Sequence, residues 1–384
     1  MKITGIAVHL VRLPTRRDHN WASKMNTPIG QHAIVELSTD EGVTGWGEAP
    51  AGATWGGAAM RYYGETAGTV RHIIDDYLAP ALGGCDPGQL GVVHARMDQT
   101  VKGHPYAKAA VDMACYDAAG KALGVSVADL LGGRLRPGIE VAHSLGIMDL
   151  ERCYAEAEQA VAEGARTIKC KTGLDPERDV TLVREVRRLV GPGVKIRVDG
   201  NEAYASVHEA VVTTRRQEEY GLLICEQPVA GAANLARVAK RIASPVMADE
   251  SAWTVQDILE LDATDAAACF SCYVTKPGGL FRARQQAEVA AALGMACDIG
   301  GSIETGVGNA ANLALGVSTP NATLPSVCPV SQPSGSSGPA IAGVYYTDDL
   351  ITTPFRFADG LVLAPEGPGL GIEVDREKLQ RYAA

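Results

Sequence analysis

Ionisable residues recur along the second half of the sequence at a nearly constant spacing. After the pair Lys169 and Lys171, successive positions lie 23 to 28 residues apart: Asp199, Glu226, Asp249, Lys276 and Glu304. Three successive acids without a nearby histidine or cysteine are oxygen donors that suit Mg²⁺, with Mn²⁺ as a possible substitute. A carboxylate substrate at such a metal would carry an acidified α-proton, because the metal stabilises the enediolate that forms when the proton leaves.

The stretch TIKCKTG, residues 167–173, places two of these lysines one residue apart in an apparent strand. Side chains i and i+2 of a strand point to the same side, so both ammonium groups should face one space. We expect Lys169 to lower the pKa of Lys171 toward neutrality, which would make Lys171 a base. Lys276, on the opposite side, is the expected second acid/base or a stabiliser of the enolate.

The elements that carry these residues have a regular order. From residue 138, about eight short apolar strands alternate with amphipathic helices, and the last strand, near 325–331, is weaker. Parallel strands covered by helices produce this pattern, and eight units in about 200 residues predict a closed (β/α)8 barrel. Each ionisable residue then follows a successive strand, so all should meet at the carboxyl-terminal mouth of the barrel.

Taken one at a time, these residues have ordinary structural interpretations. An acid after a strand often caps the next helix, and a lysine beside apolar residues can extend its ammonium to water. Three consecutive acids flanked by lysines would be costly to bury without a ligand, so the joint pattern favours a site. The CxxC pair Cys269 and Cys272 could form half a zinc site or a redox pair, but with no second pair we interpret both as structural.

Composition limits the class of protein. The chain has 384 residues, 46% hydrophobic and 21% charged, with a net charge of −10 and no basic cluster. We therefore expect two domains and no nucleic-acid partner. No stretch reads as a signal peptide or membrane span, so we expect a cytoplasmic protein without disulfides.

The order KxK, D-x-N, E-Q-P, ADES, K-P-G-G and GGSIET resembles the enolase superfamily, specifically its muconate lactonizing enzyme subgroup. The likeness extends to KAAVDMACYDAAGKALG, LLGG and PGLGIEVD. It implies a (β/α)7β-type barrel over 131–340, capped by an α+β domain from 1–130 and the tail 341–384. It also implies Asp199, Glu226 and Asp249 as Mg²⁺ ligands, Lys171 and Lys276 as the acid/base pair, and Lys169 as the residue that tunes Lys171. Asn201 of the D-x-N motif and Glu304 are the expected substrate-side residues.

The mandelate-racemase branch of the superfamily is disfavoured, because it uses a histidine late in the barrel and the last histidine here is His208. The lysine–lysine subgroup includes cycloisomerases, racemases or epimerases, and syn-dehydratases, which share the enolate step. Substrate choice should lie with loops of the first domain, which carry His19, Trp21, Lys24, Thr54 and Trp55. An unremarkable packing role is the alternative for the two tryptophans.

The segment CPVSQPSGSSG, after the expected last strand, has no acid that could grip a substrate ammonium, which weakens a dipeptide epimerase. WGEAPAGATWGG and YYTDDLIT look like muconate cycloisomerases. We therefore expect a muconate-type cycloisomerase acting on a small carboxylate as a homo-oligomer. The alternatives are a racemase or epimerase of an N-substituted amino acid or proline derivative, and a syn-dehydratase, for example of a hydroxyproline. A different metal-assisted barrel lyase, or a barrel without catalysis, would not need facing lysines.

Overall fold

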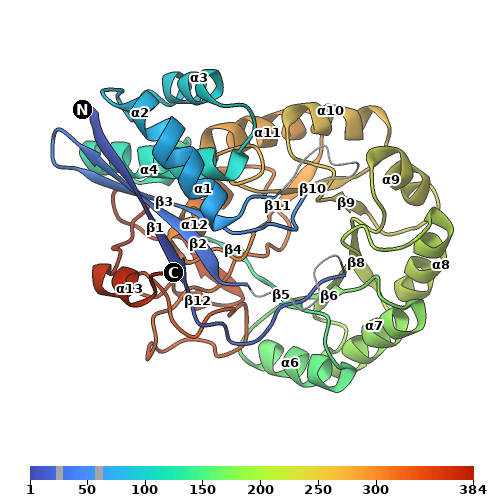
Figure 1. Ribbon diagram of the computed structural model, residues 1–384. Coiled ribbons are helices and arrows are strands. Elements are labelled where there is room, and N and C mark those ends of the chain that lie inside the picture. Colours follow the sequence, from blue (N-terminus) through green and yellow to red (C-terminus); the bar gives the residue numbers. More distant parts are fainter. Residues whose placement is uncertain (23–28, 57–63) are drawn as a thin grey trace.

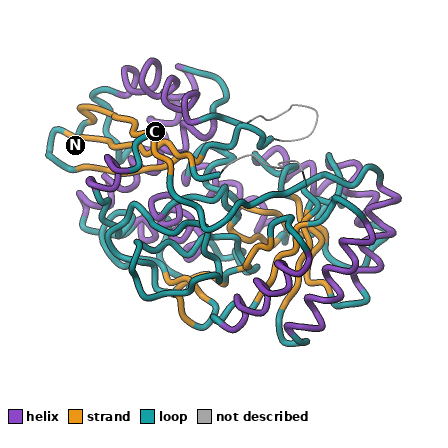
Figure 2. The backbone as a smooth tube through the Cα atoms, turned by 60° about the horizontal axis from the view of Figure 1, so that its bottom comes forward, coloured by secondary structure: helices purple, strands orange, loops and turns teal. Residues whose placement is uncertain are grey.

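The computed structural model describes residues 1–22, 29–56 and 64–384 of the chain. It consists of a curled sheet of seven parallel strands ringed by helices and a smaller antiparallel sheet that lies to one side with its own helices (Figure 1). In Figure 2 the antiparallel sheet lies apart from the barrel strands, and both chain ends lie near it. This is a TIM-like barrel with a capping domain, as the sequence predicts.

The antiparallel sheet of the cap has the order β1 (Ile3–Arg12), β2 (Gln31–Thr39) and β3 (Thr44–Pro50). Helix α4 (Pro105–Leu123) is buried for most of its length and lies very close to β3. A Cβ atom at Gly47 would lie only 1.9 Å from the carbonyl oxygen of Ala110, so glycine is required for this approach. The other helices of the first 131 residues are α1 (Ala67–Ile73), the π-helix η2 (Ile74–Leu78), α2 (Ala79–Leu82), α3 (Leu90–Thr100) and α5 (Val127–Leu130).

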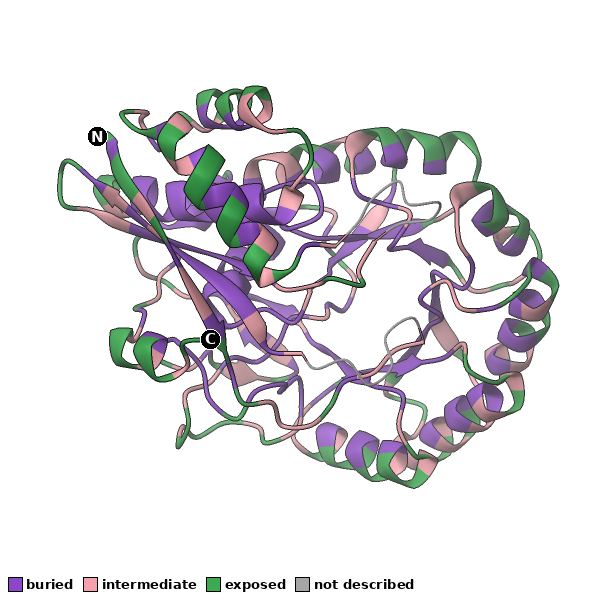
Figure 3. Cartoon of the chain, viewed as in Figure 1, coloured by how far each residue is buried: buried purple, intermediate pink, exposed green. Residues whose placement is uncertain are grey.

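The barrel alternates strands and helices as expected. Its first strand is split into β4 (Gly138–Glu140) and β5 (Ala142–Leu145), and the following strands are β6 (Thr167–Lys171), β7 (Lys195–Asp199), β8 (Leu222–Glu226), β9 (Val246–Ala248), β10 (Cys269–Cys272) and β11 (Ala296–Ile299). The helices are α6 (Leu150–Ala162), α7 (Pro176–Val190), α8 (Val207–Glu218), α9 (Ala232–Ala239), α10 (Val255–Ala263), α11 (Leu280–Ala292) and α12 (Gly306–Ser318). Figure 3 shows these outer helices buried toward the strands and exposed outward, except α12, which is buried throughout.

Two details of the barrel differ from the sequence-based expectation. The predicted last strand is not regular: residues near 322–328 close the barrel through isolated parallel bridges, Val141 with Ser326 and Cys297 with Ala322. Strand β10 ends at Cys272 rather than running on through YVT, so Lys276 lies in a turn beyond the strand. All nine cysteines are free, and Cys269 and Cys272 are buried within β10, which agrees with a structural role.

The tail contacts both parts of the molecule. Strand β13 (Leu361–Leu363) pairs with β12 (Phe357–Ala358) and with β4 of the barrel. Beyond helix α13 (Arg376–Arg381), Ala383 forms a bridge with Val11 of β1. Within the described residues there is no helix long and apolar enough to cross a membrane.

A buried carboxylate joins the cap to the barrel. Glu48 of β3 accepts hydrogen bonds from the backbone N–H groups of Thr305 and Gly308, at 2.8 and 2.7 Å, and from the Thr305 hydroxyl at 2.6 Å. It also pairs with His32 Nδ1 at 2.8 Å. These contacts satisfy N–H groups at the start of α12, where a negative charge is favoured.

Candidate active site

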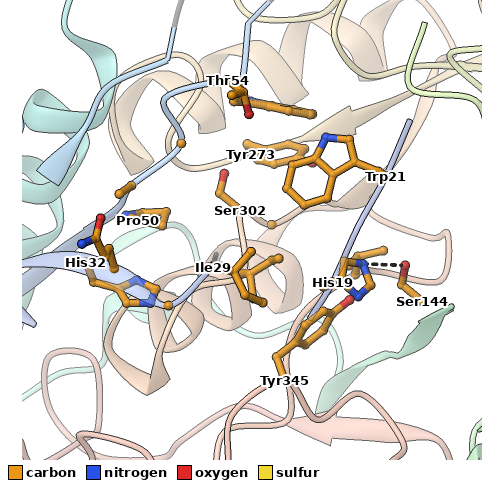
Figure 4. A pocket seen from close by; sticks show the side chains of 18 of the residues that line it. His19, Trp21, Ile29, His32, Pro50, Thr54, Ser144, Tyr273, Ser302 and Tyr345 are labelled. Atoms are coloured by element: carbon orange, nitrogen blue, oxygen red, sulfur yellow. Dashed lines mark hydrogen bonds between the residues drawn. The ribbon is translucent and has the colours of Figure 1, made fainter. Parts of the chain in front are cut away.

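A cavity of about 750 Å³ lies where the cap meets the mouth of the barrel (Figure 4). Its wall combines residues from the first loop, from the loop after β3, from strand ends, from the loop before α12 and from the tail. The residues that line it include His19, Trp21, Thr54, Trp55, Tyr106, Ser144, Lys169, Lys171, Asp249, Tyr273, Ser302 and Tyr345.

The two lysines of β6 reach this cavity and share one carboxylate. Asp199 Oδ2 lies 2.8 Å from Lys169 Nζ and 2.5 Å from Lys171 Nζ. Lys169 also donates to Glu226 Oε1 at 2.8 Å. Both lysines are almost fully buried, as alternation along β6 predicts for two residues on one face.

The electrostatics of Lys169 differ from the sequence-based picture of two repelling ammonium groups. Burial acts to lower the pKa of Lys169, but Asp199 and Glu226 outweigh it and raise that pKa above its ordinary value. The same ion pairs hold the pKa of Asp199 below its usual range, even though burial alone would raise it. Lys169 is therefore a cation held in place by two carboxylates, and Asp199 Oδ2 contacts both lysine ammonium groups.

The three predicted metal ligands end three adjacent strands. Asp199 is the register partner of Glu226, which in turn pairs with Met247, two residues before Asp249. All three carboxylates are buried, with 0, 0 and 1% exposure for Asp199, Glu226 and Asp249. Burial and the neighbouring charge of Glu226 raise the pKa of Asp249 to about 6, against the opposing effect of Lys276.

Lys276 lies on the far side of this row, next to Asp249. Its Nζ donates to the Asp249 backbone oxygen at 2.7 Å and forms a close ion pair with the Asp249 carboxylate. The ammonium also lies 4.0 Å from the ring centre of Tyr273 and 5.9 Å from that of Trp55. Lys171 and Lys276 thus flank the three acids, on β6 and after β10.

The sequence analysis did not single out a buried ion pair, Arg197 with Asp298. Arg197 is completely buried and donates to Glu226 Oε2 at 2.6 Å and to Asp298 Oδ2 at 2.8 Å. It stands two residues before Asp199 on β7, so the alternation that linked Lys169 to Lys171 would also have placed Arg197 on the inner face. Arg197 fixes one oxygen of Glu226 and leaves the other to Lys169.

The donor set fits a hard divalent cation. As the side chains stand, no three His, Cys, Asp or Glu residues in the described ranges are gathered into a ready metal-ligand group. The reason is that Asp199, Glu226 and Asp249 are bonded to lysines and Arg197. Even so, three buried carboxylates on adjacent strands offer oxygen ligands, and their mutual repulsion would be relieved by Mg²⁺.

The expected substrate-side residues take different places. Asn201 accepts a hydrogen bond from Lys171 at 2.8 Å and donates to Glu250 at 2.9 Å, which makes it a support for Lys171. Glu304 is buried behind the cavity wall, where its Oε1 accepts from the Ser302 N–H at 3.0 Å. Burial, opposed by the Ser302 N–H, raises the pKa of Glu304 to about 7.

The loops of the cap supply an aromatic wall. Trp21 and Trp55 line the cavity, and the Trp21 ring centre is 5.8 Å from Lys171 Nζ. Trp55 stacks on Tyr273, with ring centres 5.9 Å apart and planes inclined by 28°. Lys24 lies outside the described residues. Tyr345 and Ser144, which the sequence analysis did not single out, complete the wall beside His19 (Figure 4).

Comparison with known proteins accounts for this arrangement. Residues 10–132 match the family model described as mandelate racemase / muconate lactonizing enzyme, N-terminal domain, and residues 152–378 match the model described as enolase C-terminal domain-like. The chain is 34% identical to muconate cycloisomerase 1-1 of Acinetobacter lwoffii, covering 99% of this chain and 96% of that one.

Other relatives carry different activities in their names. N-succinyl-L-Arg/Lys racemase of Bacillus cereus is 30% identical, with 99% of this chain and 97% of that one covered. The crystal structure of 2-chloromuconate cycloisomerase from Rhodococcus opacus 1CP superposes with a TM-score of 0.90 at 31% identity and covers both chains completely. The chain belongs to the mandelate racemase/muconate lactonizing enzyme family of the enolase superfamily and is an enzyme of the isomerase or lyase type.

Proposed function

We propose that this enzyme removes the proton next to the carboxylate of a small acid, forms an enediolate, and carries out a muconate-type cycloisomerisation. The observation that carries this proposal is the row of three buried carboxylates flanked by Lys171 on one side and Lys276 on the other. Muconate cycloisomerases among the relatives support the choice of reaction.

Lys171 is the better placed of the two lysines to meet a substrate, because it lines the cavity. When neutral, its Nζ could take the α-proton, with Asn201 holding it in place. Lys276 would act from the opposite side, either returning a proton or steadying the enolate by its charge. Lys169, held between Asp199 and Glu226, would keep a fixed positive charge in the site.

Enzymes of this family generally depend on a divalent metal ion, and we propose that Asp199, Glu226 and Asp249 hold Mg²⁺ here, with Mn²⁺ able to replace it. The bound ion would supply positive charge where the enediolate develops negative charge. Lys171 and Lys276, which now contact Asp199 and Asp249, would then be free to face the substrate.

Racemisation of an N-substituted amino acid is the second candidate. The 30% identical N-succinyl-L-Arg/Lys racemase supports it, and lysines on both sides of a planar enolate suit proton exchange on either face. Syn-dehydration, for example of a hydroxyproline, would use the same pair. In all cases we place the enzyme in the cytoplasm, as a homo-oligomer acting on a small carboxylate.

The test is α-proton exchange in D₂O with Mg²⁺ present, followed by NMR over muconates, N-acyl amino acids, hydroxyprolines and proline betaines. Wild type, Lys171→Ala and Lys276→Ala would be compared, and Mg²⁺ binding would be measured separately by calorimetry. We expect exchange or conversion with one class, and its loss in one or both variants. The product formed identifies the reaction.

Two outcomes would contradict the proposal. Full activity of Lys171→Ala and Lys276→Ala would remove the lysines from the mechanism. Absence of Mg²⁺ and Mn²⁺ binding would remove the carboxylates from their assigned role.

A further inference from the structure

The side of the cavity formed by His19 and Ser144 has no part in the chemistry above. Ser144 belongs to β5, two strands away from Asp199 on β7 in the sheet order. Adjacent strands lie about 4.8 Å apart, so this side is roughly 10 Å from the row of carboxylates. A group here would meet the part of a substrate that lies away from the reacting carboxylate.

His19 is held firmly in this position. The backbone of its loop is tied to the rest of the protein on both sides of His19, through Arg16 N–H to Tyr345 oxygen at 2.8 Å and Ile147 N–H to Asn20 oxygen at 2.8 Å. Its ring packs edge-on against Tyr345, with ring centres 4.9 Å apart (Figure 4). His19 is only 4% exposed, yet it lines the cavity.

The hydrogen bonds of His19 determine its tautomer. Arg17 Nη1 lies 3.1 Å from His19 Nδ1, and because a guanidinium can only donate, Nδ1 must be the acceptor. Burial, together with the charges of Arg17 and Lys171, lowers the pKa of His19 well below its ordinary value, so the ring is neutral. The single ring proton is therefore on Nε2.

Arg17 is itself fixed by a buried carboxylate. Its Nε and Nη2 donate to Glu156 at 2.8 and 2.6 Å, and Arg16 and His143 contact the same carboxylate. Gly146 leaves space for the side chains of Arg17 and His19, because a Cβ there would lie 3.0 Å from Arg17 Nη1 and 3.2 Å from His19 Nδ1. Glu156 therefore fixes Arg17, and Arg17 fixes the ring of His19. The Nε2–H of His19 is thus an oriented donor at the cavity.

Among the residues that the structure describes, that donor has only a weak partner. Ser144 Oγ lies 3.5 Å from His19 Nε2, longer than the roughly 2.9–3.0 Å of a well-formed N–H···O bond. The lysine and arginine side chains that line the cavity in the described ranges are Lys169 and Lys171, both paired with Asp199. A second polar group of the substrate would therefore be met on this side by a neutral donor.

We propose that His19 donates its Nε2–H to an oxygen of a second carboxylate of the substrate, away from the reacting carboxylate. Arg17 and Glu156 are positioning residues that set the tautomer. This rests on the proposed function and deepens it, because it names the residue that selects acids with a second carboxylate.

The test uses two matched pairs of acids that differ only at the second acceptor. Muconate is compared with the hexa-2,4-dienoate of the same double-bond geometry, which has a methyl group in place of one carboxylate, and N-succinylglycine with N-butanoylglycine. Dissociation constants would be measured with wild type, His19→Phe and His19→Gln, the last of which keeps an N–H donor. We expect wild type to favour the member with the extra acceptor in at least one pair by roughly 10- to 100-fold, His19→Phe to lose the preference, and His19→Gln to keep most of it.

Wild-type binding preference that survives in His19→Phe would overturn the assignment. A second measurement needs no functional variant: ¹⁵N NMR of histidine-labelled wild type should show His19 protonated at Nε2 and not at Nδ1. Protonation at Nδ1 would also overturn it. Arg17→Met should mix the two tautomers, and an unchanged spectrum would remove Arg17 as a positioning residue.

These readouts separate the two proposals. If the acids bind with the expected preference but none is converted or exchanged, the proposed reaction fails while the role of His19 stands. If a substrate is converted equally well by His19→Phe, with an unchanged KM, the reaction stands and the role of His19 fails.

Discussion

The barrel side of the cavity, here called the floor, consists of paired charges, whereas the side formed by the cap and the tail, here called the wall, is mostly aromatic and uncharged. On the floor, Lys169, Lys171 and Arg197 contact Asp199 and Glu226 at 2.8 Å or less, and the group is almost completely buried. The wall contributed by the cap and the tail presents aromatic rings and neutral donors, among them Trp55, Tyr345 and His19. We propose that the barrel supplies the charge that takes part in the reaction, whereas the cap and the tail supply shape and selection.

The difference has a physical cause. Buried charges persist only where they are paired and where their positions are fixed, and strand ends of a parallel barrel fix them. In loops and turns, charged groups are fixed only where further contacts hold them, as at Arg17 and Lys276. Rigid aromatic side chains cover a substrate with little loss of conformational freedom. Changes to the floor should therefore abolish reaction, and changes to the wall should alter substrate choice.

The largest effect is expected from Lys171→Ala. Loss of a general base at the floor should lower kcat by roughly 10²- to 10⁴-fold. Steady-state kinetics on the substrate found by the exchange experiment would measure it. Lys195→Ala is the matched control, because Lys195 starts the neighbouring strand and its side chain is 46% exposed. Similar kcat values for the two variants would show that Lys171 matters no more to the reaction than an exposed lysine.

The junction between the two regions is tested by Glu48→Ala. This change leaves His32 and two N–H groups of α12 without their carboxylate, and removing one partner of a buried pair costs about 3–5 kcal/mol. Urea unfolding would measure the loss of unfolding free energy. Glu41→Ala, which affects a 58% exposed ion pair, should change it by less than about 1 kcal/mol. A small loss in Glu48→Ala would mean that cap and barrel are held by other contacts.

Glu304 has no ion-pair partner among the described residues, so it should titrate differently from the paired carboxylates Asp199 and Glu226. Glu304 has a pKa of about 7 in the folded protein against 4.5 for the free side chain. Between about pH 4.5 and 7 the unfolded chain loses this proton while the folded protein keeps it, so stability falls as the pH rises. The expected fall is roughly 3 kcal/mol in total and is complete above about pH 7.

Unfolding of wild type and Glu304→Gln would be compared at pH 5 and pH 8. The variant has no proton to lose at this position and should show the smaller fall. Other buried acids contribute equally to both proteins, so the difference between the two falls reports Glu304 alone. Equal falls would show that Glu304 titrates normally.

The smallest effect is expected at the wall, from Trp55→Leu. The indole ring stacks on Tyr273 and lies 5.9 Å from Lys276 Nζ, contacts worth about 1 kcal/mol each. KM should rise by roughly 5- to 30-fold while kcat changes less. Tyr77→Leu, at a 44% exposed aromatic of the cap, is the control and should change neither constant. A fall in kcat as large as that of Lys171→Ala would place Trp55 in the reaction itself.

The sequence predicted the floor well because one rule governs it. A repeat of about 27 residues and an alternation of two along each strand place Lys171, Asp199, Glu226 and Asp249 at one mouth. The same rule would have found Arg197. It could not show that Asp199 contacts both lysines, because that contact depends on the distance between strands β6 and β7.

The wall could not be predicted in the same way. His19, Ser144 and Tyr345 are far apart in the sequence and belong to a loop, a strand end and the tail. No periodicity links them, and their neighbourhood depends on how the cap and the tail pack on the barrel. The close fit at Gly146, which admits Arg17 and His19, is likewise a tertiary contact without a local signal.

The sequence by itself thus determined the barrel, the row of carboxylates and the flanking lysines, since local periodicity and strand direction are sufficient for these. Only the tertiary structure decided which charges are paired, that Lys169 is a held cation, and which tautomer His19 adopts. Pairing and hydrogen bonding depend on distances of 2.5 to 3.5 Å between residues as far as 139 positions apart. Such distances are fixed only when the cap, barrel and tail are packed together.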